Sequence, residues 1–430
     1  MRKIYLILLI AAIAPIRLFA QGPDTTFNVQ AVQSLEEYLA SDAMRGRAVF
    51  TPDIERAADY VETQFRASGL NTWNGSASYR QPFSMVRAHL DSVHGSLDGT
   101  PLNTDNTIVI SSAPQLQIDD HSGYQLASIK TGEDLRTKAL FYLHSKANYF
   151  VIVDTSFAKT FSRLNRMAGQ QFKSEYSSVF VLSPTASTHF SLTAYQNVQE
   201  SKLANVVGIL PGKGKHQDEY VIFSGHYDHL GVRKPDARGD SIYNGANDDA
   251  SGTTAVILLS RYFSQLHNNG RTLVFAAFTA EEIGEYGSQY FSGQFDPDKV
   301  VAMFNIEMIG SPSKWGENSA FITGFERSSM STILQRNLTG TGFSFYPDPY
   351  PTQNLFYRSD NASLARKGVP AHTISTTQID IDKTYHTPED EVSTLDLKNM
   401  AAIIKAIALS SLTIVEGKDT PSRVDTSQLH

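Results

Sequence analysis

The chain has 430 residues and a formal net charge of −7 at pH 7, with 41% hydrophobic and 19% charged residues. This composition is typical of a globular protein, and at ~150 residues per domain the length permits two or three domains. The negative net charge argues against nucleic acid or an anionic membrane as the main partner. The sequence contains no cysteine, which excludes disulfides, thiolate zinc sites and a cysteine nucleophile. Any metal ion would therefore be held by His, Asp and Glu.

The first twenty residues have the pattern of a bacterial signal peptide. Arg2 and Lys3 precede an apolar run, from Ile4 to Ile16, that is too short for a stable membrane anchor. Ala20 provides the small residue expected before a cleavage site. A buried N-terminal helix is the alternative. We expect residues 1–20 to be removed and the mature protein to be periplasmic or secreted, without a membrane anchor, because no other segment looks long and apolar enough to span a bilayer.

Two helices are predicted next. The capping-box spacing of the segment Ser34-Leu35-Glu36-Glu37 predicts a helix that begins at Ser34. A second helix is expected to begin at Thr51-Pro52, with proline in the first turn, and to end before Gly69.

The character of the sequence changes in the middle of the chain. Residues 88–200 contain short alternating strands and Ser/Thr-rich turns, which predict a separate β-rich insert. Residues 140–153 could form one αβ unit within it. The segment 418–430 is polar and is predicted to be a mobile tail.

From Leu203 onward, apolar runs alternate with amphipathic helices. The expected strands are Val206–Leu210, Tyr220–Ser224, Thr272–Phe278, Val300–Ile306 and Ala371–Ser375. The expected helices are Ser251–Leu266, Gly287–Phe291, Ser329–Asn337 and Leu395–Val415. Continuous apolar strands covered by helices predict an α/β fold, a three-layer sandwich with a mostly parallel central sheet. In such sheets the ligand site lies beyond the carboxyl ends of the strands.

Acidic residues and histidines gather at those strand ends. They are His226, Asp228, Asp248, Glu281, Glu282, Glu307 and His386. Each segment alone also fits a solvated loop or a helix cap, with Asp249 or Ser251 as the capping residue. Two adjacent carboxylates at a sheet edge repel each other unless a cation or a proton separates them. Together the residues suit zinc in a nitrogen and oxygen site with positions left for water and substrate.

The motifs that contain these residues resemble those of a known family. They are G-H-x-D-H-x-G, G-A-x-D-x-A-S-G, A-E-E-x-G-x-x-G-S, N-x-E-M-x-G and Y-H-T-x-x-D. In this order they are similar to the co-catalytic zinc peptidases of metallopeptidase clan MH, which include bacterial leucyl aminopeptidases, aminopeptidase Y and glutamate carboxypeptidase. The similarity covers Leu35–Gly69 and Leu203 to about Val415. It implies a discontinuous catalytic domain, residues 21–87 and 201–417, and an insert, residues 88–200, at the position where relatives carry a protease-associated domain.

The resemblance implies a role for each site residue. His226, Glu307 and Asp248 would bind one zinc ion, and Asp248, Glu282 and His386 the other, so that Asp248 bridges two Zn²⁺ ions. Glu281 would be the general base, Asp228 the partner of the second ring nitrogen of His226, and Tyr385 a residue beside the scissile carbonyl. As in relatives, the peptide bond between Asp228 and His229 is predicted to be cis.

Two positions depart from the family pattern. Glu307 stands where relatives usually have aspartate, and Asn361 stands where many have histidine in a Ser-Asp-His triplet. The function expected is that of an aminopeptidase acting on peptides with a free N-terminus. A glutaminyl cyclase, a carboxypeptidase of the same fold and a non-catalytic binding module are the alternatives.

Overall fold

The computed structural model describes residues 22–184 and 189–429. The predicted signal peptide, residues 1–20, lies outside the described residues. The chain divides into two compact units, one formed by the residues up to Tyr79 and from Val206 onward, the other by Arg80–Asn205. These divisions lie close to the ends of two long strands, whereas the boundaries expected from the sequence, after residues 87 and 200, lie inside those strands.

The first unit contains a mixed central sheet in the strand order β17-β16-β18-β15-β11-β14-β10, with β1 also paired to β10. Its strands are β1 (Asn71–Thr72), the end of β10 (Phe190–Leu210), β11 (Tyr220–His226), β14 (Thr272–Phe278), β15 (Val300–Ile306), β16 (Ser319–Ile322), β17 (Ser344–Pro347) and β18 (Ala371–Ser375). Strand β11 pairs in parallel with β14 and β15, and β15 pairs in parallel with β18. The mostly parallel sheet predicted from the sequence is therefore confirmed.

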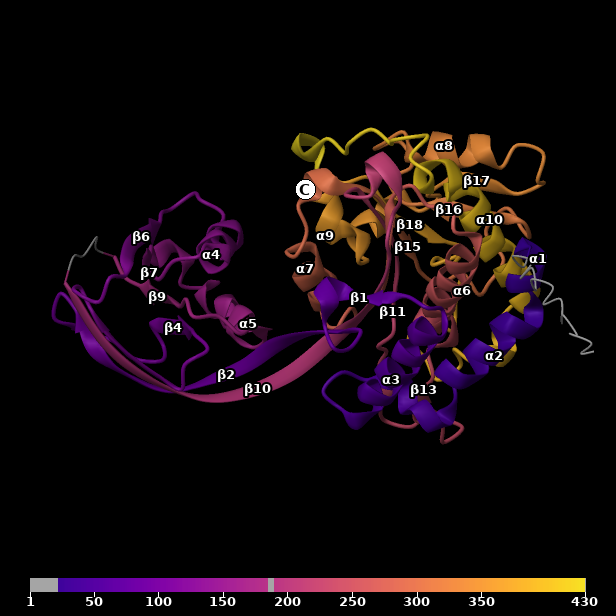
Figure 1. Ribbon diagram of the computed structural model, residues 1–430. Helices are drawn as coiled ribbons and strands as arrows, with labels where there is room; N and C mark the ends of the chain where they lie inside the picture. The colour runs from indigo at the N-terminus through magenta and orange to yellow at the C-terminus, as the bar shows by residue number, and fades with distance from the viewer. Residues whose placement is uncertain (1–21, 185–188, 430) are drawn as a thin grey trace, which may run out of the picture. The chain divides into compact units, whose positions relative to one another are not determined.

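Helices cover both faces of this sheet (Figure 1). They are α1 (Pro23–Thr26), α2 (Val29–Leu39), α3 (Pro52–Ala67), α6 (Ser251–Leu266), α7 (Tyr286–Ser292), α8 (Met330–Asn337), α9 (Asn361–Ala365) and α10 (Leu397–Val415). Val221 and Phe223 of β11 pack into the core beneath α6 and α10, whereas Ile222 packs into the core that contains Phe291 of α7. Because successive strand residues face opposite sides and both sides are buried, the strands are apolar throughout.

Two predictions about helices need correction. Helix α2 begins at Val29, not at Ser34, because the Asn28 side chain accepts the N–H of Ala31 and caps the helix there. Helix α10 is long and apolar enough by length and composition to span a membrane, contrary to the expectation that no such segment exists. It packs against α2, α6 and α8. Of its most apolar 18-residue stretch, 67% is buried, as in a core helix.

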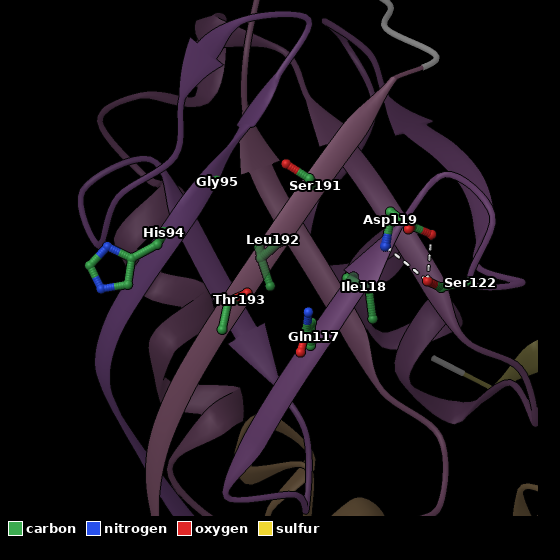
Figure 2. Close-up of a pocket in the computed structure, with 9 residues that line it drawn as sticks. All are labelled: His94, Gly95, Gln117, Ile118, Asp119, Ser122, Ser191, Leu192 and Thr193. Carbon is green, nitrogen blue, oxygen red and sulfur yellow. Dashed lines mark hydrogen bonds between the residues drawn. The ribbon is translucent and has the colours of Figure 1, made fainter.

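The second unit contains two sheets. One consists of β2 (Arg80–Leu97), β3 (Thr100–Pro101), β5 (Gln115–Asp119), β8 (Gln171–Phe172) and the first part of β10. The other has the order β4-β9-β7-β6, formed by β4 (Thr107–Ile110), β6 (Gln125–Ile129), β7 (Tyr149–Val153) and β9 (Ser178–Leu182). The chain passes from β6 through α4 (Leu135–His144) to the parallel strand β7, while the short α5 (Asn165–Ala168) follows later. An open groove of about 500 Å³ lies over β2, β5 and β10 (Figure 2).

The segment predicted to be a mobile tail is packed within the first unit. The Arg271 guanidinium donates to the carbonyl oxygen of Asp419 at 2.6 Å, and the Arg423 guanidinium donates to that of Val300 at 2.8 Å. Val424 is 4% exposed. These contacts hold the segment in place.

Candidate metal centre

The candidate site is built where neighbouring parallel strands end. Strand β11 ends at His226, β14 ends just before the segment with Glu281 and Glu282, and β15 ends just before Glu307. In the sheet His226 is paired with Phe278, so the ends of β11 and β14 are level. The carboxyl ends of parallel strands meet at one edge, and these side chains therefore share one region.

Asp248 lies between two histidines. Its Oδ1 is 3.2 Å from Nε2 of His226, and its Oδ2 is 3.1 Å from Nε2 of His386. Asp248 and His226 are 3% and 1% exposed. The structure thus brings together three residues that are 22 or more positions apart in the sequence, and each carboxylate oxygen faces a different histidine.

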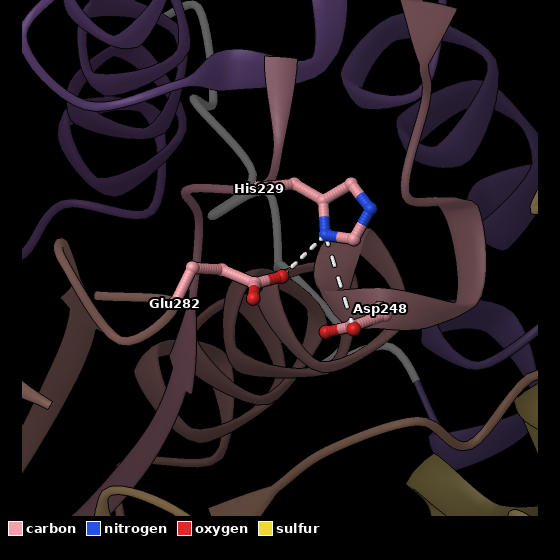
Figure 3. Close-up of side chains that lie close together, drawn as sticks. All are labelled: His229, Asp248 and Glu282. Atoms are coloured by element: carbon pink, nitrogen blue, oxygen red, sulfur yellow. Dashed lines mark ion pairs between the residues drawn. The ribbon is translucent and has the colours of Figure 1, made fainter. Parts of the chain in front are cut away.

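Glu282 also contacts His386, and it contacts a histidine to which the sequence motifs assigned no role. Its Oε2 is 3.2 Å from Nε2 of His386, while its Oε1 is 2.6 Å from Nδ1 of His229. Figure 3 shows the His229 ring directed at both Glu282 and Asp248. The three side chains offer ligand atoms within 4.8 Å of one another. The only sequence signal for His229 was its place in the motif that starts at Gly225.

The backbone leaves room for His229. Gly245 has a φ of 60°, and a Cβ atom at this position would lie 2.5 Å from Cδ2 of the His229 ring. A larger residue would therefore displace the histidine, and only glycine adopts this backbone conformation without a penalty.

Glu281 and Asp228 lie beside His226. Oε2 of Glu281 is 3.9 Å from Nε2 of His226. The carboxylate of Asp228 accepts the main-chain N–H groups of Glu281 and Glu282 at 3.2 and 3.4 Å. Nδ1 of His226 lies 3.0 Å from the main-chain oxygen of Asp228 but 3.7 Å from its Oδ1. Asp228 does orient His226, but through its carbonyl group and not, as predicted, through its carboxylate.

Glu307 and Tyr385 line a pocket beside the cluster. Glu307 accepts a hydrogen bond from the hydroxyl of Ser359, and no ion pair joins it to a histidine among the described residues. The pocket that it lines with Tyr385 is narrow, with room for about 40 Å³. The Tyr385 ring stacks on that of His386, with centroids 3.9 Å apart. The apolar part of the pocket wall comes from Met308, Phe321, Leu355 and Ile379.

Two further aspartates hold the ligand segments through main-chain bonds. Asp249 accepts the N–H groups of His226 and Met308 at 3.1 Å, and that of Gly252 at 2.9 Å. It thereby holds the first turn of α6, whose N-cap residue is Ala250, and also joins the ends of β11 and β15. Asp390 accepts the N–H of Asp248 at 3.0 Å.

The predicted cis peptide bond between Asp228 and His229 is wrong. The non-proline cis bond of the described residues joins Asp248 to Asp249. With a trans bond after Asp228, the Asp228 carbonyl oxygen takes the contact with His226, and the carboxylate is left for the main-chain N–H groups of the Glu281 segment.

Three residues around the site have positive φ angles although they are not glycine. These are Ala280 at 61°, Met308 at 52° and His386 at 58°. Ala280 precedes Glu281, Met308 follows Glu307, and His386 contacts Asp248. Backbones of this kind are uncommon outside glycine and cluster at functional sites, where the surroundings impose them.

The charges of the site are unbalanced towards the negative. Burial raises the pKa of Glu281 well above its ordinary value and that of Glu307 to about 7, although the nearby His226 opposes both shifts. Burial also acts on Asp248, but hydrogen bonds with His226 and His386 hold the pKa of this carboxyl well below its ordinary value. Burial opposes protonation of His386, yet Asp248 and Glu282 raise its pKa to about 9. The carboxylates thus exceed what the histidines neutralise, which favours bound cations.

The donor set fits zinc. Nε2 of His226, both ring nitrogens of His229 and Oε1 of Glu282 are buried and lack a partner with hydrogen-bond geometry. Buried polar atoms without partners are costly, and a metal ion would satisfy those of His226 and Glu282. Imidazole nitrogens and carboxylate oxygens in a cysteine-free site are ligands that zinc accepts.

Sequence comparisons place this site in a known family. Residues 205–411 match the model of "Peptidase family M28". The chain is 28% identical over 211 residues to "Leucine aminopeptidase 1" of Ajellomyces capsulatus (strain H88), which is 46% of this chain and 52% of the relative. It is 35% identical over 166 residues to "Probable zinc metalloprotease" of Pyrenophora teres f. teres (strain 0-1), which is 38% of this chain and 32% of the relative. The matches thus span about half and about a third of these relatives.

Solved structures share the fold. The aminopeptidase from Aneurinibacillus sp. strain AM-1 is similar with a TM-score of 0.54 and 16% identity, over 91% of this chain and 94% of that chain. The zinc aminopeptidase BSAP from Bacillus subtilis has a TM-score of 0.54 and 17% identity, over 91% of this chain and 95% of that chain. The family match covers every predicted metal ligand, from His226 to His386; His226, Glu282 and Glu307 lie at or just after strand ends, and Asp248 and His386 lie in loops. Residues 205–411 of this chain therefore belong to peptidase family M28.

Proposed function

We propose that the protein is a zinc-dependent exopeptidase, and specifically an aminopeptidase that works with two zinc ions. The observation that carries this proposal is the position of Asp248, whose two carboxylate oxygens face His226 and His386 at 3.2 and 3.1 Å. A carboxylate that presents one oxygen to each of two histidines suits a bridge between two cations.

Two ligand sets follow. His226, Asp248 and Glu307 would hold one ion, and Asp248, Glu282 and His386 the other. The contacts of Glu282 with His386 support the second set directly. To bind the first ion, the Glu307 side chain would leave the Ser359 hydroxyl and turn towards His226. His226 and Glu307 stand at the ends of the paired strands β11 and β15, so this turn brings them together.

When bound, zinc would supply Lewis acidity and a water whose pKa is lowered towards ~7. Glu281 is then the residue placed to move the proton, because it is not needed in either ligand set. Its Oε2 lies 3.9 Å from Nε2 of His226, so its carboxylate is close to the position where the water would be held. Glu281 would accept the proton from the attacking water at Oε2 and pass it to the leaving amine. The phenol of Tyr385 lines the adjacent pocket and would donate to the oxyanion that forms on the substrate.

The narrow pocket supports an apolar side chain at the N-terminal residue of the substrate. Met308, Phe321, Leu355 and Ile379 line it beside Glu307 and Tyr385. An apolar side chain placed there removes its surface from water without leaving a buried charge unpaired. The name of the relative "Leucine aminopeptidase 1" agrees with such a substrate.

A single panel of substrates tests the proposal. The zinc-loaded protein should hydrolyse leucine p-nitroanilide and a leucyl dipeptide, and should not cleave the same compounds after N-acetylation. Cyclisation of an N-terminal glutaminyl peptide without hydrolysis would identify a glutaminyl cyclase instead. Cleavage that persists after N-acetylation and removes the C-terminal residue would identify a carboxypeptidase. Zinc binding with no turnover of any of these compounds would indicate a binding module.

We also propose that the protein is exported to the periplasm or the medium. The support is the basic start and short apolar run of residues 1–20. N-terminal sequencing of the protein recovered from the periplasmic fraction and the medium should give Gln21 as the first residue. An unprocessed Met1 in the cytosolic fraction would refute export.

A further inference from the structure

Arg47 is a fully buried arginine, with 0% of its surface exposed, and its guanidinium donates to four main-chain oxygens. Nε donates to Tyr227 at 2.8 Å, and Nη2 to Gly245 at 2.9 Å. Nη1 donates to both Leu39 at 2.7 Å and Asn244 at 2.6 Å. Four of the five N–H groups of the guanidinium are therefore used, and each carbonyl belongs to a turn or a helix end.

These carbonyls belong to the segments that carry the metal ligands. Tyr227 stands between His226 and Asp228, and Asn244 and Gly245 stand just before Asp248. The main-chain oxygen of Arg47 also accepts the N–H of His229 at 3.3 Å. One side chain thus joins the loop after β11 to the loop before α6.

A second tie joins the same parts of the chain. The Asn244 side chain donates to the carbonyl oxygen of Ala40 at 2.8 Å and to Oδ1 of Asp42 at 2.9 Å. The short helical segment Asp42–Arg47 therefore contacts the Asp248 loop through both of its ends. Residues from the N-terminal part of the chain form the support beneath a site whose ligands all come after residue 225.

The charge of Arg47 does not form an ion pair. No carboxylate of the described residues lies within 4.0 Å of its guanidinium, and Glu36, Asp390, Asp248 and Asp228 act on it only at longer range. A buried cation is costly unless its hydrogen bonds are satisfied. Here main-chain oxygens satisfy it, and only the planar fork of arginine can reach four of them. The arrangement therefore serves backbone geometry and not charge pairing.

We infer that Arg47 is a positioning residue of the metal centre, which sets the separation of His226 from Asp248. This inference rests on the proposed metal centre. Zinc–nitrogen and zinc–oxygen bonds are ~2.0–2.2 Å long, so a shift of a few tenths of an ångström between the two loops changes how well both residues reach one ion. Arg47 holds the carbonyl group of the residue after His226 and two carbonyl groups of the loop that leads to Asp248, and thereby fixes that separation before a metal ion binds.

The chain provides a matched control for the loss of a buried arginine. Arg271 is also 0% exposed, and it donates to the main-chain oxygens of Ile414 and Asp419 at 2.6 Å and to the side chain of Glu219. It holds the C-terminal segment and contacts none of the ligand loops. Substitution of either arginine should lower the stability of the metal-free protein, in the variants Arg47→Lys, Arg47→Met, Arg271→Lys and Arg271→Met. Only the two changes at Arg47 should lower the affinity for zinc.

The experiment measures zinc affinity by competition with a chelator, together with urea unfolding of the metal-free protein. The Arg47 variants should bind zinc about 10–100-fold more weakly, the range for residues that orient metal ligands, with Arg47→Met the weaker of the two. The Arg271 variants should bind it like the wild type. For a variant that is unfolded without metal, the free zinc concentration that restores folding gives the same comparison.

The outcomes separate the inference from the proposed function. Arg47 variants that bind zinc as tightly as the Arg271 variants would overturn the inference and leave the metal centre intact. A wild type that binds no zinc would overturn both. Weakened zinc binding in the Arg47 variants, in a protein that hydrolyses no peptide, would support the inference and overturn the proposed activity.

Discussion

Glu281 and Glu282 are adjacent residues with different surroundings, and exchanging each for glutamine separates their roles. Glu282 contacts His229 and His386 at 2.6 and 3.2 Å, whereas the nearest histidine nitrogen to Glu281 is 3.9 Å away, in His226. Glu281→Gln keeps the shape and removes the base, so we expect kcat to fall by ~10²–10⁴, about 3–5 kcal/mol in the barrier, with zinc still bound. Glu282→Gln removes a ligand, so zinc affinity should fall and excess zinc should restore part of the activity.

The assay follows leucine p-nitroanilide hydrolysis and bound zinc in both variants side by side. Asp228→Asn is the intermediate case, because the Asp228 carboxylate holds the main-chain N–H groups of both glutamates and is in neither proposed ligand set. Its loss of activity should be ~10–100-fold. If Glu281→Gln lost zinc while Glu282→Gln retained it, the two roles would be exchanged. Unchanged hydrolysis in both variants would place the active site elsewhere.

Three further predictions concern the site and its surroundings. Glu307→Asp shortens the one ligand that departs from the family pattern, and chelator competition should show zinc affinity equal to or higher than that of the wild type; a loss of one bound ion would contradict this. His229→Asn should weaken zinc binding ~10–100-fold through its contact with Glu282, whereas His372→Asn, at a buried histidine held by Ser328 and Thr323, should leave zinc affinity unchanged. Burial raises the pKa of Glu36 from 4.5 to about 8, so the folded state keeps a proton that the unfolded chain releases. The free energy of unfolding of the metal-free protein should therefore fall as pH rises from 4.5 to 8, by up to about 5 kcal/mol, and urea titrations of Glu36→Gln should lack this part of the slope.

The elements of the first unit follow closely from the sequence. Strands β14, β15 and β18 and helix α6 have the predicted ends, because strands buried on both faces are apolar at every position and stop abruptly at polar turns. Prediction was poorer where a side chain competes for a helix end. Ser34 has the spacing of a cap, but its hydroxyl donates to the Gln30 carbonyl inside a helix that Asn28 already caps.

Topology predicts that His226, Glu282 and Glu307 come together, because each follows one of the paired strands β11, β14 and β15, whereas Asp248 and His386 stand in loops and were assigned through the family resemblance. In the structure His226, Asp248, Glu282 and His386 all meet. His229 was not predictable in this way. It stands in a turn, and the direction of its ring depends on the space left by Gly245, which is 16 residues away in the sequence.

The supports of the site could not be inferred from spacing because they act through main-chain atoms. Asp228 reaches His226 through its own carbonyl oxygen, Asp249 accepts N–H groups at the end of β11 and just after β15, and Arg47 donates only to carbonyl groups. Main-chain partners are the same for every residue type, so the sequence carries no record of which ones are used. Only the donor or acceptor side chain is visible.

Adjacent acidic residues at this site make different contacts, because the backbone directs their side chains differently. Asp248 faces the histidines, while Asp249 turns to the N–H groups of His226 and Met308. Glu282 faces two histidines, while Glu281 is left with the weaker approach to His226. In each pair one carboxylate contacts histidines, and the other either accepts main-chain N–H groups or has only a distant histidine neighbour. Two like charges can therefore be neighbours in the sequence without competing for the same cation. For Glu281 and Glu282, the positive φ angle of Ala280, the residue just before them, helps to set the direction of the backbone.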